Sequence, residues 1–175
     1  MIRRMQASDR ARVLSLLENT NMFTETELQV AQEQIDIYLN IVHQTDYSLV
    51  IVETTGSQVA GFLSYGPVPL TQGVYDLYWM AIAPEVQGQG YGKELVRWLE
   101  EQVSGASGRM ILIQTSSQPR YEGTRAFYRA MGYEEAFCIP DYYKPGDDLI
   151  SYIKLFEKKD ITQYGRMATN LKAES

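Results

Sequence analysis

Three glycines alternate with other residues in the segment 87–92, Gln-Gly-Gln-Gly-Tyr-Gly, after an apolar run and before a helical pattern. Glycine adopts positive φ easily and lets a ligand approach the backbone closely. The free N–H groups at the start of a helix attract anions. The spacing therefore predicts a phosphate-binding turn, and Lys93 in the first helical turn is consistent with an anion nearby.

Two well-known nucleotide-binding patterns do not fit this turn. A P-loop needs Ser or Thr directly after its lysine, but Glu94 follows Lys93. A dinucleotide-binding fingerprint has Gly-x-Gly-x-x-Gly near the start of a βαβ unit, whereas these glycines alternate in mid-chain. An ordinary connection between a strand and a helix stays open as the third interpretation.

Two other side chains could move protons. Asp76 lies in an aromatic, strand-like run, where loss of solvent would raise the pKa of its carboxyl group and make it a base. Tyr128 lies in a helical pattern among apolar neighbours, where a phenol with a pKa of about 10 can donate a proton but a core aromatic is the favoured interpretation. The structural alternatives are an aspartate that binds turn amides and a tyrosine in the core.

The apolar periodicity predicts the elements that hold these residues. In order, they are a strand at 2–5, helices at 8–19 and 24–39, strands at 47–53, 58–65 and 74–82, a helix to 105, a strand at 110–114, a helix at 124–131, and strands at 133–139 and 149–156. Strands mixed with helices in this way indicate a layered α/β domain with a mixed sheet. We expect one domain over 1–157 and a polar tail over 158–175.

Four local signals refine these boundaries. Ser8 is expected to cap the first helix, and Thr24 with Glu27 forms a capping box for the second. A Thr-Thr-Gly-Ser turn at 54–57 predicts a hairpin, and the segment 140–148 reads as a loop.

Composition restricts the partners. The net charge of −6 argues against nucleic acid, because phosphate binding needs clustered Lys and Arg. The N-terminus lacks the apolar run of a signal peptide, and no stretch reaches the roughly 20 apolar residues of a membrane helix, so we expect a cytoplasmic protein without a membrane partner. The single cysteine, Cys138, is expected to be a buried thiol, and the single histidine, His43, a surface residue. Together they predict no metal site.

Two sequence blocks resemble the GNAT superfamily of N-acetyltransferases. The run 80–93 matches its Gln/Arg-x-x-Gly-x-Gly/Ala motif, with Gln87, Gly90 and Gly92 in the fixed places, after an apolar-Ala-apolar triplet and a proline turn. The run 124–133 is similar to the family segment Ala-x-x-x-Tyr-x-x-x-Gly-Phe. The resemblance extends over most of the chain and implies a GNAT fold, with a mixed central sheet flanked by helices and splayed between its fourth and fifth strands.

The resemblance also implies acetyl-CoA as co-substrate and no metal. The backbone of the apolar triplet would bind the pantetheine arm and the glycine turn would hold the pyrophosphate, so the implied contacts are Met80, Ala81, Ile82, Gln87, Gly88, Gln89, Gly90, Tyr91, Gly92 and Lys93. The amine would attack directly within a ternary complex. The N–H of Ile82 would stabilise the developing oxyanion and Tyr128 would protonate the sulfur.

The general base is less well defined by the resemblance. The central region resembles the ribosomal-protein alanine acetyltransferases, whose glutamate on the fifth strand corresponds to Gln114, and a glutamine cannot accept a proton. Histone-type relatives carry a glutamate on the fourth strand, at the position of Asp76. We therefore take Asp76 as the candidate base, and strand alternation predicts that it shares a face with Tyr78 and Met80.

Two segments are expected to shape the acceptor site: residues 21–27 and residues 139–148. In the second, Tyr142 and Tyr143 with three aspartates could surround an amine, or Lys-Pro-Gly-Asp could simply form a turn. Arg120 and Arg125 are candidates for binding a phosphate or an acceptor carboxylate, and Tyr121 falls where many relatives have an asparagine.

The sequence therefore predicts an N-acetyltransferase that acts on a primary amine, which could be a small amine, an amino acid or a protein N-terminus. Two alternatives stay open: use of a longer acyl-CoA, and a non-catalytic CoA-binding sensor or interaction module. The resemblance also implies that the chain can form a homodimer.

Overall fold

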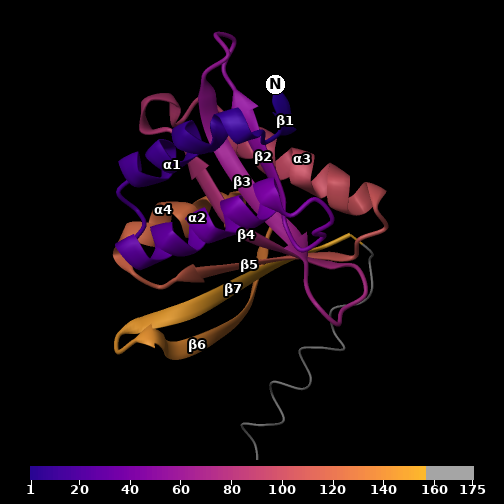
Figure 1. Cartoon of the computed structure of the whole chain (residues 1–175). Helices are drawn as coiled ribbons and strands as arrows, with labels where there is room; N and C mark the ends of the chain where they lie inside the picture. Colours follow the sequence, from indigo (N-terminus) through magenta and orange to yellow (C-terminus); the bar gives the residue numbers. More distant parts are fainter. Residues whose placement is uncertain (157–175) are drawn as a thin grey trace, which may run out of the picture.

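The computed structural model describes residues 1–156, which form one mixed sheet of seven strands covered by helices (Figure 1). The strands are β1 (Ile2–Arg4), β2 (Ser48–Glu53), β3 (Val59–Pro67), β4 (Val74–Ile82), β5 (Met110–Ser116), β6 (Glu134–Lys144) and β7 (Asp147–Leu155). The helices are α1 (Arg10–Asn19), α2 (Glu25–Asn40), α3 (Tyr91–Gly105) and α4 (Glu122–Ala130). The tail expected over 158–175 lies outside the described residues.

The sheet order β1-β2-β3-β4-β5-β7-β6 divides the interior into two cores. Helices α1 and α2 cover one face, where Ile35, Ile51 and Phe62 are buried. Helices α3 and α4 cover the other face, where Leu63 and Leu99 are buried. This arrangement confirms the predicted α/β fold with a mixed sheet flanked by helices.

Strand β4 is paired with β5 along only part of its length. The two strands run parallel, and their pairing covers Val74–Leu77 and Met110–Ile113. Beyond Leu77, β4 continues to Ile82 along β3 alone. The expected splay between the fourth and fifth strands is therefore present, and we call the opening beyond Leu77 and Ile113 the gap.

A β-bulge in β4 changes the direction of the side chains at the gap. Leu77 pairs with Tyr65, whereas Trp79 pairs with Ser64, so Tyr78 is the extra residue. Leu77 and Met80 consequently both belong to the core under α3 and α4. The prediction that Asp76, Tyr78 and Met80 share one face was wrong, because simple alternation does not continue across a bulge.

The helix starts were predicted with mixed success. The capping box of α2 is confirmed: Thr24 N–H donates to Glu27 at 2.7 Å, and Glu27 N–H donates to the Thr24 hydroxyl at 3.3 Å. Ser8 does not cap α1, because a 3-10 turn at Ala7–Asp9 precedes that helix. Asp9 stabilises this turn instead, since its buried carboxylate accepts from the N–H of Gln6 at 2.8 Å and from Arg3.

The loop predicted over 140–148 is a continuous hairpin of β6 and β7. Lys144 and Asp147 face each other across a two-residue turn that contains Gly146 at φ 79°. Strand β6 forms an edge of the sheet, and all its residues are exposed. Cys138 is therefore exposed, contrary to the expected buried thiol, whereas His43 is exposed as predicted.

Gly66 provides a test of the packing beside the gap. It pairs with Asp76, and a Cβ atom at Gly66 would overlap the carbonyl oxygen of Asp46. We expect Gly66→Ala to lower the free energy of unfolding by about 1–3 kcal/mol, measured by urea denaturation. Gly123→Ala is the control, since no atom lies within 4 Å of its Cβ position and the helical site favours alanine. Equal stability of both variants would contradict this account of the packing.

Candidate functional site

The glycine turn forms an open cradle of backbone groups at the start of α3. Gly88 and Gly90 have φ values of 76° and 96°, and no atom lies within 4 Å of a Cβ built on either residue. The first hydrogen bond of the helix runs from Glu94 N–H to the carbonyl oxygen of Gly90 at 3.0 Å. The N–H groups of residues 91–93 therefore have no partner within the helix, and no side chain caps it. Such a cradle fits a phosphate or pyrophosphate group.

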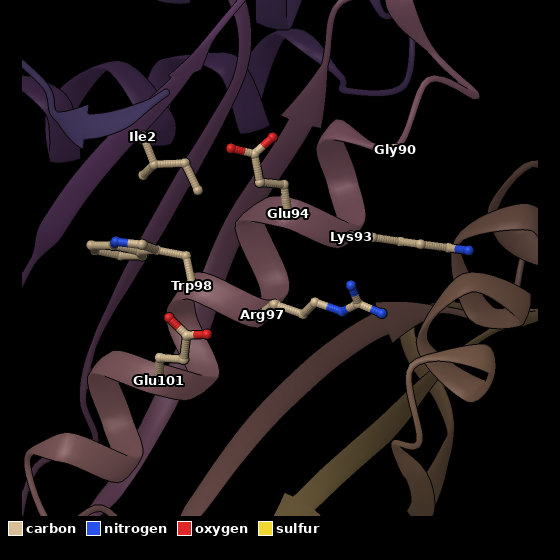
Figure 2. A pocket seen from close by; sticks show the side chains of 7 residues that line it. All are labelled: Ile2, Gly90, Lys93, Glu94, Arg97, Trp98 and Glu101. Atoms are coloured by element: carbon tan, nitrogen blue, oxygen red, sulfur yellow. The ribbon is translucent and has the colours of Figure 1, made fainter.

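A surface hollow of about 540 Å³ lies along α3 (Figure 2). Lys93 and Arg97 extend from one side of the helix, toward the part of the molecule that contains α4, whereas Glu94 and Glu101 extend from the opposite side. The two cations are one helical turn apart, and Lys93 comes directly after the glycine turn. This side of α3 is therefore suitable for an anionic ligand. We did not predict Arg97 from the sequence, although its four-residue spacing from Lys93 was a usable signal.

The backbone of β4 presents unpaired groups to the gap. Ala83 N–H points toward β3, where it donates to Ala60 at 2.9 Å. Because successive N–H groups of a strand alternate in direction, those of Met80 and Ile82 point away from β3, toward the gap. Gln87 donates its side-chain amide to the carbonyl oxygen of Ile82 at 3.2 Å, so the motif glutamine links the glycine turn to the end of β4. This geometry fits the expected contacts of Met80 and Ile82 with an extended arm.

Tyr128 belongs to the core under α3 and α4, in the same cluster as Leu77 and Ile113. Its ring is buried between Phe127 and Tyr133, with centroid distances of 5.3 and 5.8 Å. Burial raises the pKa of the phenol well above its usual value, so the hydroxyl is protonated. This hydroxyl forms no hydrogen bond with any residue in 1–156, although it is not sealed from solvent. It is therefore available as a proton donor.

Asp76 occupies the opposite side of the sheet. It pairs with Gly66 on β3 and with Leu112 on β5, one position before the gap. Burial raises the pKa of the carboxyl group to about 6, in the direction predicted from the sequence. Asp76 and Leu112 share a face, and so does the exposed Gln114 two residues further along β5.

The two candidate proton-transfer groups therefore lie on opposite faces of the sheet. Asp76 lies on the face of α1 and α2, whereas Tyr128 belongs to the core under α3 and α4. A donor that enters beside α3 and an acceptor that enters beside α2 could meet in the gap, each next to one of these groups.

The segment that follows β5 is held to two other parts of the chain. The hydroxyl of Tyr121 donates to the carbonyl oxygen of Met22, in the connection between α1 and α2, at 3.0 Å. Ser117 accepts from the N–H of Asp148 at 2.8 Å, which attaches the segment to the start of β7. The segment after β5 is thus tied to both segments that were expected from the sequence to shape the acceptor site, and that role stays a prediction.

Arg125 has a structural role, which corrects the prediction that it meets an external anion. Its buried guanidinium donates to the carbonyl oxygens of Ser116 at 2.6 Å and Gln118 at 3.1 Å, and to Glu122 at 2.7 Å. These bonds occupy the side chain and fix the segment that leads into α4. Arg120 is exposed and lies over the ring of Tyr121 at 5.0 Å.

Two other kinds of feature were searched for in the part of the chain that the structure describes. Within residues 1–156, no three His, Cys, Asp or Glu side chains are grouped so that they could hold a metal ion. None of the helices formed by these residues is long and apolar enough to cross a membrane.

Comparison with known proteins identifies the family. A family model described as an acetyltransferase (GNAT) domain matches residues 45–135. A GNAT-family protein from Desulfovibrio desulfuricans is 34% identical with a TM-score of 0.82, and the match covers 89% of this chain and 98% of that one. No curated protein sequence matched.

More distant structures share the fold. The ribosomal-protein-S18-alanine N-acetyltransferase of Escherichia coli is 16% identical with a TM-score of 0.72, over 91% of this chain and 95% of that one. An aminoglycoside 6'-N-acetyltransferase complexed with coenzyme A is 15% identical with a TM-score of 0.69, over 91% and 98%. With the glycine cradle and the splayed strands, these matches show that the chain belongs to the GNAT family and is an acyl-CoA-dependent N-acetyltransferase.

Proposed function

We propose that this enzyme transfers the acetyl group of acetyl-CoA to a primary amine by direct attack, with Asp76 as the base and Tyr128 as the acid. The observation that supports the proposal is that these two groups lie on opposite faces of the sheet, with Asp76 one position before the gap between β4 and β5. The glycine cradle and the side chains of Lys93 and Arg97 would hold the phosphates of the donor.

Acetyl-CoA supplies the acetyl group as a thioester, and the residues of the chain account for the proton movements. Asp76 accepts a proton from the amine, directly or through water, as the nitrogen–carbon bond forms. The N–H of Ile82 donates to the carbonyl oxygen as negative charge develops on it. When the carbon–sulfur bond breaks, the hydroxyl of Tyr128 donates its proton to the sulfur, and solvent returns a proton to the phenol.

Gln114 distinguishes this scheme from one with a base on β5. Its amide is exposed on the face of Asp76 and cannot take up a proton, but it can hydrogen-bond a water molecule or the acceptor. A non-catalytic CoA-binding protein would bind the thioester without releasing thiol. A longer acyl donor would instead give faster thiol release than acetyl-CoA, so thiol release with an amine panel separates the three functions.

Gly90 tests the phosphate cradle. A valine at this position would have to adopt a φ near 96°, which is strained for an L residue, and its side chain would project into the open cradle. We expect Gly90→Val to raise the Kd for CoA by about ten-fold or more, measured by isothermal titration calorimetry. Gly105→Ala, at the other end of α3, is the control and should bind CoA as the wild type does.

Tyr128 tests the proton donor. The hydroxyl has no hydrogen bond within residues 1–156, so Tyr128→Phe removes it without breaking a contact of the described structure. We expect kcat to fall by about a hundred-fold while the Kd for acetyl-CoA changes little. An unchanged kcat in single-turnover measurements would exclude the role of Tyr128 as the acid.

Asp76 tests the base through the pH dependence. Wild-type kcat/KM should decrease as the pH falls through about 6, because protonation removes the base. We expect Asp76→Asn to lower kcat/KM and to abolish this acidic limb. A retained limb at the same pH, with an unchanged rate, would show that another group is the base.

Stability measurements give an independent check of the same pKa. Burial makes the charged form of Asp76 unfavourable, so its contribution to stability is largest below the unfolded pKa of 3.8 and is lost as the pH rises through about 6. We expect Asp76→Asn to be more stable than the wild type at neutral pH. This advantage should disappear in acid.

A further inference from the structure

Asp147 is a buried carboxylate that faces Lys144 across the β6–β7 turn without forming an ion pair with it. It is only 6% exposed, and its one hydrogen bond within residues 1–156 comes from the hydroxyl of Ser116. None of the ion pairs formed by the described residues includes it. A buried charge of this kind is unfavourable unless a cation compensates it. No ion pair within the described residues compensates this charge, so a ligand could supply the positive group.

Register places Asp147 on the acceptor side of the sheet. Asp147 and Ser151 are four positions apart on β7. Because side chains alternate along a strand, both lie on the same face. Ser151 pairs with Gln114, which shares its face with Asp76. Ser116, the hydrogen-bond partner of Asp147, is four residues beyond Leu112, the β5 residue that pairs with Asp76, or roughly 13 Å along the strand. Asp147 is thus on the face of the candidate base and some distance from it.

A second polar group on this face also lacks a partner. The side chain of Ser151 is completely buried, and its hydroxyl forms no hydrogen bond with the described residues. Ser151 stands between Gln114 on β5 and Phe137 on β6. Two buried polar groups with incomplete hydrogen bonding therefore lie on one strand face, at the acceptor end of the gap.

The pKa values of two tyrosines respond to the charge of Asp147. Burial is the main cause of the raised pKa of Tyr121 and of Tyr143, the latter to about 12, and the negative charges of Asp147 and Glu27 add to it in both residues. Both rings are therefore within electrostatic reach of two carboxylates. Phenol rings and hydroxyls next to carboxylates provide a favourable environment for a cation. Arg120, the cation beside Tyr121, forms no ion pair within residues 1–156.

The reacting nitrogen cannot be the group that Asp147 binds. That nitrogen has to lose a proton in order to attack, and Asp76 is the carboxylate beside the gap. A cation held at Asp147 must then be a different group of the same acceptor. An acceptor with two amino groups separated by an apolar spacer could place one amino group beside Asp76 and the other at Asp147.

We propose that Asp147, next to Ser116, binds a second, protonated amino group of the acceptor, so that the enzyme acts on diamines and polyamines in preference to monoamines. The inference rests on the proposed acetyl transfer for its catalytic readout. The binding of the second amino group can be measured without catalysis.

The test compares an α,ω-diamine with the alkyl monoamine of the same chain length. We expect wild-type kcat/KM to be about ten-fold or more higher for the diamine, since a hydrogen bond to a charged group has at least that effect. Asp147→Asn keeps an oxygen for the Ser116 hydroxyl but removes the charge, and should bring the ratio close to one. Glu134→Gln, an exposed charge change on the neighbouring strand, should keep the wild-type ratio.

A second readout uses the thermal unfolding of the wild type without acetyl-CoA. The diamine should raise the Tm more than the monoamine does at equal ionic strength, and this difference should disappear in Asp147→Asn. A wild-type rate ratio near one, or turnover of a peptide N-terminus while neither alkyl amine reacts, would overturn the proposal and leave acetyl transfer intact. Absence of both CoA binding and thiol release would instead overturn the proposed function, and the Tm difference would still decide the role of Asp147.

Discussion

The ending of the β4–β5 pairing at Leu77 and Ile113 is the constraint on which the rest of the structure depends. Backbone N–H and C=O groups inside a protein need hydrogen-bond partners, and an interrupted sheet leaves such groups without neighbours. Here β3 supplies partners on one side of β4 only, so the groups of Met80 and Ile82 that point the other way are available to a ligand. An extended ligand arm can take the place of the missing strand. The donor site therefore consists mainly of backbone, and the glycine turn continues it to the start of α3.

The bulge at Tyr78 determines how the site divides between the two faces of the sheet. Without it, the side chains of Asp76 and Met80 would point to the same side, and the candidate base would lie among the groups that contact the donor. With the bulge, Asp76 faces the side of α2 and Met80 the side of α3. Burial raises the pKa of both Asp76 and Tyr128. This common shift makes the carboxylate a stronger base and keeps the phenol protonated.

Local signals in the sequence were sufficient for most of the elements and for the open glycine turn. The capping box at Thr24, the apolar triplet that ends at Ile82 and the glycine spacing each depend on residues close together in the chain, and the structure has a helix start, a strand end and an open turn at these places. The bulge was not predictable in this way, because Leu77-Tyr78-Trp79 is an ordinary strand sequence. Only the pairing with β3 shows that Tyr78 is an extra residue. Arg125 was misread for the same reason, since its carbonyl partners depend on how the segment after β5 folds back.

The acceptor side depends almost entirely on contacts between distant parts of the chain, and this explains why its details escaped the sequence. The hydroxyl of Tyr121 and the carbonyl oxygen of Met22 are 99 residues apart in the chain, and Ser116 and Asp147 are 31 apart. Asp147 follows a Pro-Gly turn, where an aspartate is usually just a polar turn residue, and only its pairing with Ser116 shows that it is buried. A donor site of backbone groups tolerates many side chains, because the strand and the turn supply the contacts. An acceptor site of side chains changes with each substitution, so acceptor choice can vary while the acetyl-transfer scaffold stays the same.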